Sequence, residues 1–343
     1  VIMLLKKLSE AFGVSGAEDD VRNILRKELT DYGSITTDTM GNLFIKKDNI
    51  SDKPVLMLCA HMDEVGLMIS SIENNGWLRF VTIGGIDERV LVSKNVIVGT
   101  KRVKGVIGAK AIHLQEPRER QIPLKTKNLY IDIGANNKED AEKMVSIGDY
   151  VVFDTEFSEI NENIISGKAF DDRVGCYILS EILKRDYTLP ITGVFTVQEE
   201  IGLRGSAVAA YSVNPDIAIV LEGTFATDVP DSSKESWITT MGKGPAITFM
   251  DRTYIAPKEL INRVSHIAET KKIPYQLKKA AFGGTDGGRI YTTQEGIPTI
   301  VISVPCRYIH SPVSMANKKD IQNTISLVDS IIQDFQERGV NTK

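Results

Sequence analysis

The sequence predicts an α/β fold in which helices flank a doubly wound mixed sheet and an inserted small β-barrel domain interrupts the chain. Apolar runs typical of buried strands alternate with segments of helical periodicity on both sides of the insert. This alternation is typical of a sheet covered by helices on both faces. Residues 67–165 differ, because they consist of short β-rich pieces with frequent glycines.

The N-terminal part contains one predicted helix and one predicted buried strand. In AEDDVRNILRKELTDYG, Val21, Leu25 and Leu29 recur at helical spacing, acidic residues occupy the first turn, and Gly33 indicates the end. The apolar run VLML at residues 55–58 is typical of a buried strand in an α/β sheet, and it ends abruptly in polar residues.

The alternation of helices and strands resumes after the insert. We expect helices over residues 172–186, 202–212, 257–272 and 318–339, and buried strands over residues 191–200, 215–224 and 297–305. The sequence therefore predicts one discontinuous domain, residues 1–66 plus 166–343, split by the insert at residues 67–165. Both chain ends belong to the larger domain.

Composition excludes several classes of function. The formal charge is -4 and no Lys/Arg-rich run stands out, so we expect no nucleic-acid partner. No window approaches 18 apolar residues, and the short apolar N-terminus lacks a signal-peptide pattern, so we expect a cytoplasmic protein without a membrane partner. Cys59, Cys176 and Cys306 are odd in number and widely spaced, which predicts buried, reduced thiols.

Histidine or acidic residues follow four of the predicted strands where each strand ends. These residues are His61 and Asp63, Glu199 and Glu200, Glu222, and His310. A fifth position, Asp171-Asp172, opens the first helix after the insert. The carboxyl ends of strands in an open α/β sheet form one rim, so these side chains can converge. Each residue alone is more often structural than functional.

Convergence of several acids on one rim favours a metal site. Clustered carboxylates repel one another unless a cation neutralises them. Two imidazoles and several carboxylates suit zinc, cobalt or manganese, and the set is too large for one tetrahedral ion. A pair of ions would use the whole set.

The spacing within the cluster suggests separate roles. Strand periodicity would place His61 and Asp63 on one face, where Asp63 can orient the imidazole. Adjacent Glu199 and Glu200 would point in opposite directions, so that one holds metal and the other moves protons. The alternatives are an Asp that caps a turn and a Glu-Glu pair that opens a solvated helix.

Five motifs, taken in order, resemble those of the tetrahedral aminopeptidases: AHMDEVG (60–66), GKAFDDRVG (167–175), VQEEIGLRGS (197–206), LEGT (221–224) and CRYIHSP (306–312). The family includes glutamyl aminopeptidases and proteins called cellulase M or endoglucanase, within the di-metal zinc-dependent exopeptidase superfamily. The resemblance spans nearly the whole chain. It implies a zinc-exopeptidase-like (phosphorylase/hydrolase-like) fold and a metal-dependent enzyme that removes N-terminal residues from peptides.

The resemblance also implies roles for single residues. One ion would be held by His61, Asp171 and Glu222, and the other by Asp171, Glu200 and His310. Glu199 would be the general base that takes a proton from the metal-bridging water, and Asp63 would tune His61. Asp171 and Asp172 would be joined by a cis peptide bond.

One metal-binding position departs from the family pattern, and two segments contain candidate substrate contacts. The fourth metal-binding acid is often Asp in relatives but is Glu222 here, with Asp228 as a second candidate. The loop GGTDGGR resembles a segment that borders the substrate, so Thr285 and Asp286 are candidate contacts, although a plain turn is equally compatible. Arg252 is a candidate for the specificity pocket, where it would favour acidic side chains.

The resemblance further implies self-association into a hollow homododecamer built from dimers, with the insert mediating assembly.

Three rival functions stay open at this point. A glycoside hydrolase also uses paired carboxylates, but carboxylates tied to metals are not free for that chemistry, and the chain has only two Trp residues. A metallo-carboxypeptidase or deacylase would use a similar order of residues. A non-catalytic metal-binding scaffold would not need Glu199.

Overall fold

The computed structural model describes residues 2–47, 55–279 and 283–340. Its larger part is built on an eleven-stranded mixed sheet with the strand order β1-β2-β12-β3-β13-β16-β17-β11-β10, and β14 and β15 continue from β16. The strands are β1 (Ser34–Thr37), β2 (Leu43–Lys47), β3 (Leu56–His61), β10 (Ser158–Glu159), β11 (Ile164–Gly167), β12 (Ile191–Thr196), β13 (Ile217–Phe225), β14 (Ala246–Thr248), β15 (Gln276–Leu277), β16 (Thr299–Arg307) and β17 (Ser314–Asn317).

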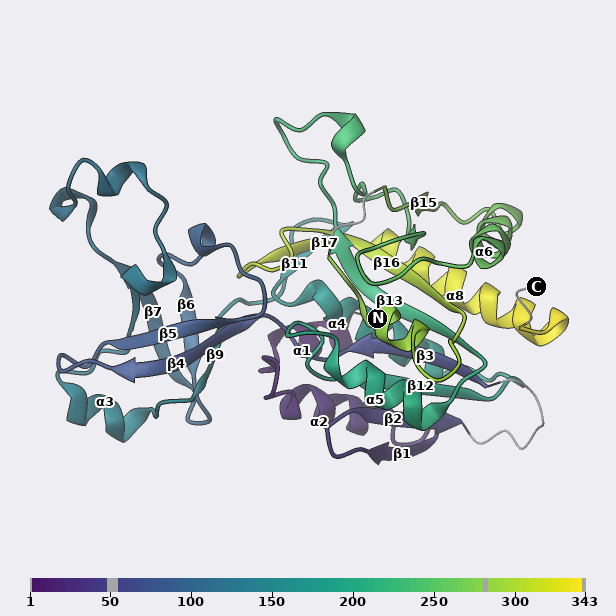
Figure 1. Cartoon of the computed structure of the whole chain (residues 1–343), viewed down its shortest axis with the longest axis horizontal. Coiled ribbons are helices and arrows are strands. Elements are labelled where there is room, and N and C mark those ends of the chain that lie inside the picture. Colours follow the sequence, from purple (N-terminus) through teal and green to yellow (C-terminus); the bar gives the residue numbers. More distant parts are fainter. Residues whose placement is uncertain (1, 48–54, 280–282, 341–343) are drawn as a thin grey trace.

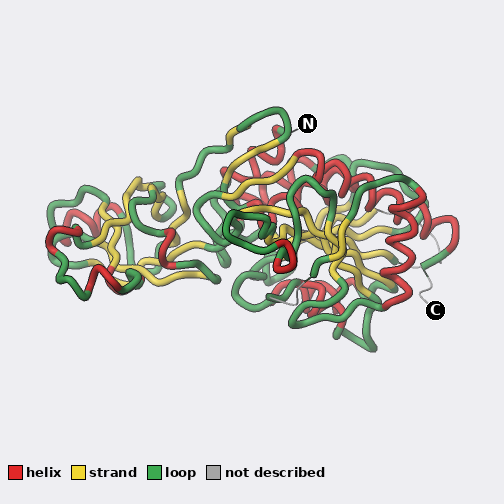
Figure 2. Tube along the Cα trace, turned by 90° about the horizontal axis from the view of Figure 1, so that it is seen from above, coloured by secondary structure: helices red, strands yellow, loops and turns green. Residues whose placement is uncertain are grey.

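Helices cover both faces of this sheet (Figures 1 and 2). They are α1 (Met3–Glu10), α2 (Asp19–Glu28), α4 (Phe170–Leu183), α5 (Arg204–Val213), α6 (Lys258–Thr270), α7 (Asp286–Tyr291) and α8 (Lys318–Arg338). Alternate residues of the central strands face opposite sides, so that Ile219 packs in the core with α4 and α8 while Val220 packs in the core with α5 and α7. The predicted α/β fold with a mixed sheet is confirmed.

A closed six-stranded barrel forms the smaller part, at the left of Figure 1. It contains β4 (Gly66–Ile72), β5 (Leu78–Ile83), β6 (Asn95–Val98), β7 (Val103–Ala109), β8 (Leu129–Asp132) and β9 (Tyr150–Phe153), with helix α3 (Lys138–Met144) beside them. The barrel buries an apolar core of its own, which includes Leu67, Val96 and Ile131. The inserted β-barrel is therefore confirmed, while β10 and β11 pair with the main sheet rather than with the barrel.

Two details of the predicted strands are wrong, and both lie at strand ends. The strand expected over residues 191–200 stops at Thr196, because Gln198 adopts a left-handed conformation (φ 57°) that turns the chain. Strand β3 stops at His61, so Asp63 lies in the following segment.

Cys59, Cys176 and Cys306 are buried free thiols, as predicted. None of the helices in the described ranges is long and apolar enough to cross a bilayer.

A buried ion cluster lies where the chain passes between the main sheet and the barrel. The Glu64 carboxylate is 2.5 Å from the Lys168 ammonium and 3.1 Å from the Arg173 guanidinium. Arg173 also donates to the Met62 carbonyl, and Lys168 donates to the Ala11 carbonyl. The cluster therefore joins the N-terminal segment, the segment that leads into the barrel and the start of α4. Burial lowers the pKa of Lys168 to about 8. One buried carboxylate thus compensates two buried cations.

Replacing that carboxylate should destabilise the fold. We expect Glu64→Gln to lower the free energy of unfolding by about 3–5 kcal/mol, because it leaves two buried cations without a counter-charge. Glu159→Gln is the matched control, since Glu159 pairs with Lys318 at the surface and its removal should cost less than about 1 kcal/mol. Urea unfolding of both variants measures the difference, and equal small losses would contradict a stabilising role for the cluster.

Candidate metal centre

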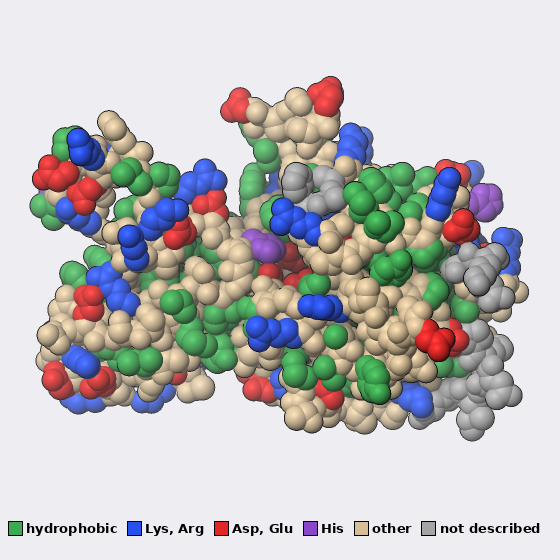
Figure 3. All heavy atoms as spheres, viewed as in Figure 1, with side chains coloured by type: hydrophobic (Ala, Val, Ile, Leu, Met, Phe, Trp, Pro, Cys, Tyr) green, Lys and Arg blue, Asp and Glu red, His purple; other side chains and the backbone are tan. Residues whose placement is uncertain are grey.

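Parallel strands bring the predicted site residues to one rim of the sheet. Strands β12, β3, β13 and β16 run parallel to one another, so their carboxyl ends meet at the same edge. The rim residues come from the end of β3, the turn after β12, β13, the segment after β16 and the start of α4: His61, Glu199, Glu200, Glu222, His310 and Asp171. A cavity of about 370 Å³ opens there, and acidic side chains and a histidine are visible in a hollow of Figure 3.

Asp171 occupies the middle of the cluster. Its Oδ1 is 3.3 Å from His61 Nε2, and its Oδ2 is 3.3 Å from His310 Nε2. Each imidazole has a second acid nearby, with Glu222 Oε2 at 3.6 Å from His61 Nε2 and Glu200 Oε2 at 3.7 Å from His310 Nε2. The peptide bond between Asp171 and Asp172 is cis, as the resemblance implied. One carboxylate therefore links two His-acid groups.

The electrostatics of the rim fit a bound cation. Burial raises the pKa of Glu222 well above its ordinary value, and repulsion from Asp172 adds to this effect. Burial and repulsion from Asp171 raise the pKa of Glu200 to about 7. Although burial opposes its charge, His310 has a pKa raised to about 10 by Glu200 and Asp171. Glu222 Oε1 is buried without a hydrogen-bond partner in the described residues, so it retains an acceptor for a cation.

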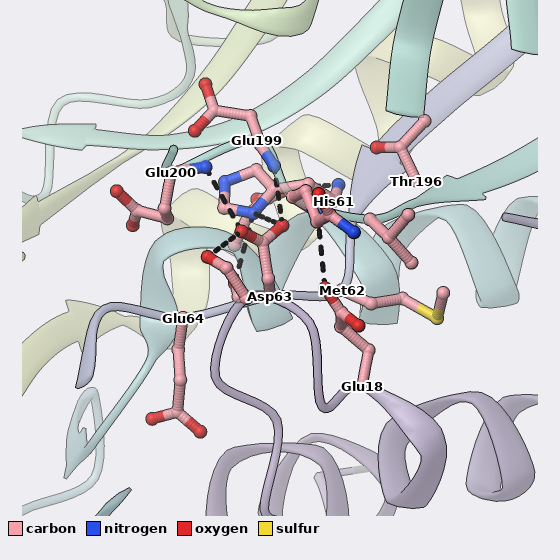
Figure 4. Close-up of polar contacts among 12 residues, drawn as sticks. Glu18, His61, Met62, Asp63, Glu64, Thr196, Glu199 and Glu200 are labelled. Carbon is pink, nitrogen blue, oxygen red and sulfur yellow. Dashed lines mark hydrogen bonds and ion pairs between the residues drawn. The ribbon is translucent and has the colours of Figure 1, made fainter. Parts of the chain in front are cut away.

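Asp63 supports both sides of the cluster (Figure 4). His61 Nδ1 is 3.1 Å from the Asp63 carbonyl oxygen and 3.4 Å from its Oδ1, which leaves Nε2 directed at the rim acids. The Asp63 carboxylate accepts hydrogen bonds from the backbone N–H groups of Glu199, at 2.9 Å, and Glu200, at 3.1 Å. Ser15 Oγ donates to the same carboxylate at 2.6 Å. Asp63 thus positions an imidazole and the turn that carries two glutamates.

Glu18 was missed at the sequence level, although it helps to hold this turn. Its Oε1 accepts hydrogen bonds from the N–H groups of Gly16, at 2.8 Å, and Gln198, at 3.2 Å. Burial raises the pKa of Glu18 to about 7, and the nearby charge of Asp63 adds to the rise. An acid at the start of a helix is ordinary, so nothing in the sequence pattern marked it.

The barrel contributes one contact to the rim. His310 Nδ1 lies 2.8 Å from the carbonyl oxygen of Gly85, which belongs to the insert, and this contact leaves Nε2 directed at Asp171 and Glu200. The ring of Phe225 stacks on the His310 ring with 5.6 Å between centroids. The sequence carried no signal for either contact.

The candidate substrate residues separate into different places. Thr285 lines the cavity, whereas Asp286 is buried beside it and accepts a 2.5 Å hydrogen bond from Thr196. Arg252 is exposed and is not among the cavity-lining residues. Asp228 pairs with Arg307 at 2.6 Å instead of joining the cluster. A lysine that the sequence did not single out, Lys278, lines the cavity.

Comparison with known proteins places this geometry in context. The family model described as M42 glutamyl aminopeptidase matches residues 41–327. The lysyl aminopeptidase of Pyrococcus furiosus is 32% identical over 97% of this chain and 97% of its own length. The crystal structure of a TET aminopeptidase from a Thaumarchaeota archaeon is 38% identical, covers 99% of this chain and 97% of its own, and superposes with a TM-score of 0.95. The dodecameric PhTET1-12s structure is 32% identical over 97% of this chain and 98% of its own, with a TM-score of 0.85.

The raised pKa of Glu18 predicts that the stability of the folded protein depends on pH. Because this pKa is about 7 in the folded protein against 4.5 for an ordinary glutamate, the folded state holds more protons between these values, and its stability should fall as pH rises through them. The loss is on the order of 3 kcal/mol. Glu18→Gln keeps an oxygen for both N–H donors and stays neutral, so it should be the more stable protein at pH 8 and similar to the wild type at pH 4.5.

Urea unfolding of metal-depleted protein across this pH range measures the effect. Glu295→Gln, at an exposed position, is the control and should follow the wild-type curve. A Glu18→Gln protein that is less stable than the wild type at pH 8 would contradict the assignment.

Proposed function

The chain belongs to the M42 glutamyl aminopeptidase family and is a peptidase, and from this premise we propose that it hydrolyses the N-terminal residue from peptides with two divalent cations held at the rim. The observation that carries the proposal is the position of Asp171 between two imidazoles. Its two oxygens face different histidines, and each histidine has a further acid within 3.7 Å.

Two sets of ligands follow from these contacts. His61, Asp171 and Glu222 would hold one cation, because both acids lie close to His61 Nε2. Asp171, Glu200 and His310 would hold the other. The mixture of imidazole and carboxylate suits zinc, with cobalt or manganese as alternatives. When bound, such cations polarise the scissile carbonyl and lower the pKa of the attacking water. The residues behind them, Asp63 and Gly85, orient the two imidazoles.

Glu199 is the general base in this proposal. Its backbone N–H is held by Asp63, and its side chain lines the cavity. Its carboxylate lies within 4.8 Å of the ligand atoms of His61 and Glu222, but it makes no ion pair within 4.0 Å in the described part of the chain. Glu222 is therefore the closer partner of His61. Burial raises the pKa of Glu199 well above its ordinary value, which suits a carboxylate that takes a proton from water and returns it to the leaving amine.

A glycoside hydrolase fits this arrangement less well. In a glycoside hydrolase two carboxyl groups must be free to act as acid and as base or nucleophile. Here Asp171, Glu200 and Glu222 each lie within 3.7 Å of an imidazole, as ligands of a shared cation would. The cavity, at about 370 Å³, is within the range of small-molecule sites and is compatible with one terminal residue at a time.

We also propose self-association through the barrel and a cytoplasmic location. One solved relative is a dodecamer. The barrel segment between β7 and β8 exposes three large apolar side chains, Ile112, Leu114 and Ile122, which are 62–69% accessible in the single chain. A measurement of mass in solution tests assembly from dimers into a dodecamer. Three buried free thiols are compatible with a reducing compartment.

Replacing each of the two adjacent glutamates by glutamine in a separate variant distinguishes proton transfer from metal binding. We expect Glu199→Gln to lower kcat by about 100-fold or more, because it removes the base, while the protein keeps two metal ions per chain. Glu200→Gln, the matched control, should lose metal as well as activity. The measurements are hydrolysis of an aminoacyl p-nitroanilide with added zinc, cobalt or manganese, and metal content after dialysis. Near-wild-type turnover by Glu199→Gln would exclude it as the base.

A further inference from the structure

Ser15 lies in a buried segment that runs behind the metal centre. It belongs to the connection between α1 and α2, which lies along the residues that follow β3. Val14 pairs with Glu64 in a parallel bridge, and the Glu64 N–H donates to the Gly13 carbonyl at 2.9 Å. Ser15 is only 3% exposed, and Asp63, which it contacts, is fully buried. The backbone of its own segment therefore holds the Ser15 hydroxyl beside Asp63.

A tight turn fixes the position of Ser15. The Ala17 N–H donates to the Val14 carbonyl at 2.7 Å, so Ser15 and Gly16 are the two central residues of a β-turn. Gly16 has a φ of 91°, and a Cβ atom there would lie 2.6 Å from the hydroxyl oxygen of Tyr150 in the barrel. Because the turn is closed and packs tightly on the barrel, the Ser15 side chain has little freedom to move.

The hydrogen bond from Ser15 completes the set of donors on the Asp63 carboxylate. Ser15 Oγ lies 2.6 Å from Asp63 Oδ2, within the range of a charge-assisted O–H···O⁻ bond. The other hydrogen bonds come from the N–H groups of Glu199 and Glu200 (Figure 4). On the Oδ1 side, the carboxylate lies 3.4 Å from His61 Nδ1. These three residues are the ones that Asp63 positions, whereas Ser15 holds the carboxylate from an independent part of the chain.

We propose that Ser15 is a positioning residue of the metal centre and that it acts through Asp63. The Asp63 carboxylate lies against His61, a ligand of one proposed ion, and accepts the N–H of Glu200, a ligand of the other. Without the Ser15 hydroxyl, the carboxylate would keep only partners that can move together with it, so both ligands would be less firmly placed. This inference rests on the proposed metal centre and adds to it a residue that is not itself a ligand.

A purely structural role for Ser15 predicts a different result. Loss of a buried hydrogen bond would then lower the free energy of unfolding of the metal-free protein and leave the metal affinity of the folded protein unchanged. Ser180 provides the matched control, because it is also buried and donates one hydrogen bond, to the Cys176 carbonyl at 2.8 Å within α4. Ser180→Ala removes the same hydroxyl group at a position without contact to Asp63.

Cobalt titration of the folded, metal-depleted proteins tests the inference. We expect Ser15→Ala to bind both ions with dissociation constants about 10- to 100-fold above those of the wild type, as is typical when a group behind a metal ligand is removed. The visible absorption bands of the cobalt-loaded protein should also change, because they report the geometry of the ligands. Ser180→Ala should keep the wild-type dissociation constants and spectrum, even if urea unfolds it more easily.

Each outcome bears on one of the two proposals. Wild-type cobalt affinity and spectrum in Ser15→Ala would overturn the role of Ser15 and leave the metal centre intact, and so would an equal loss of affinity in Ser180→Ala. If Ser15→Ala does not fold, Ser15→Cys makes the same test, because its S–H group is a weaker donor and wild-type affinity would again overturn the role. A wild-type protein that binds no divalent cation would contradict the metal centre itself.

Discussion

Buried and half-buried carboxylates that crowd one rim of a sheet impose the main physical constraint on this molecule. Asp171, Glu199, Glu200 and Glu222 share a small space with two imidazoles, and burial together with mutual repulsion raises the pKa of the three glutamates. Protons on these groups can relieve the repulsion, and so can cations. In our proposal cations take this role, and the shared carboxylate of Asp171 joins the two halves of the centre.

The fold meets this constraint with residues that lie behind the rim and position its histidines and glutamates. The Asp63 carboxylate accepts hydrogen bonds from two N–H groups of the turn after β12 and also lies against His61. One carboxylate therefore positions residues that follow or end two adjacent strands. A carbonyl of the barrel, from Gly85, lies against His310. The buried Glu64 cluster lies at the crossing between the two parts of the chain. The rim is therefore held by long-range contacts, which fix the turn that carries Glu199 and Glu200 and the segment that carries His310 against the ends of the strands.

Much of the fold and most of the rim could be predicted, because strands and amphipathic helices leave periodic patterns and because parallel strands end at one edge. Apolar periodicity does not reveal where a strand stops, so the left-handed turn at Gln198 was missed. Glu18, Gly85 and Lys278 are ordinary residues in their own segments, and only tertiary contacts bring them to the rim. Arg252 is close in sequence to cavity residues, but its side chain lies in solvent.

The shared carboxylate of Asp171 is the centre of this account, and metal stoichiometry tests it most directly. Zinc titration of the metal-depleted protein, followed by calorimetry and elemental analysis, should give two ions per chain for the wild type. Asp171→Asn has nearly the same shape but lacks the charge and one acceptor oxygen, so binding of both ions should weaken together. Two tightly bound ions in Asp171→Asn, or a single ion in the wild type, would contradict a centre joined through this residue.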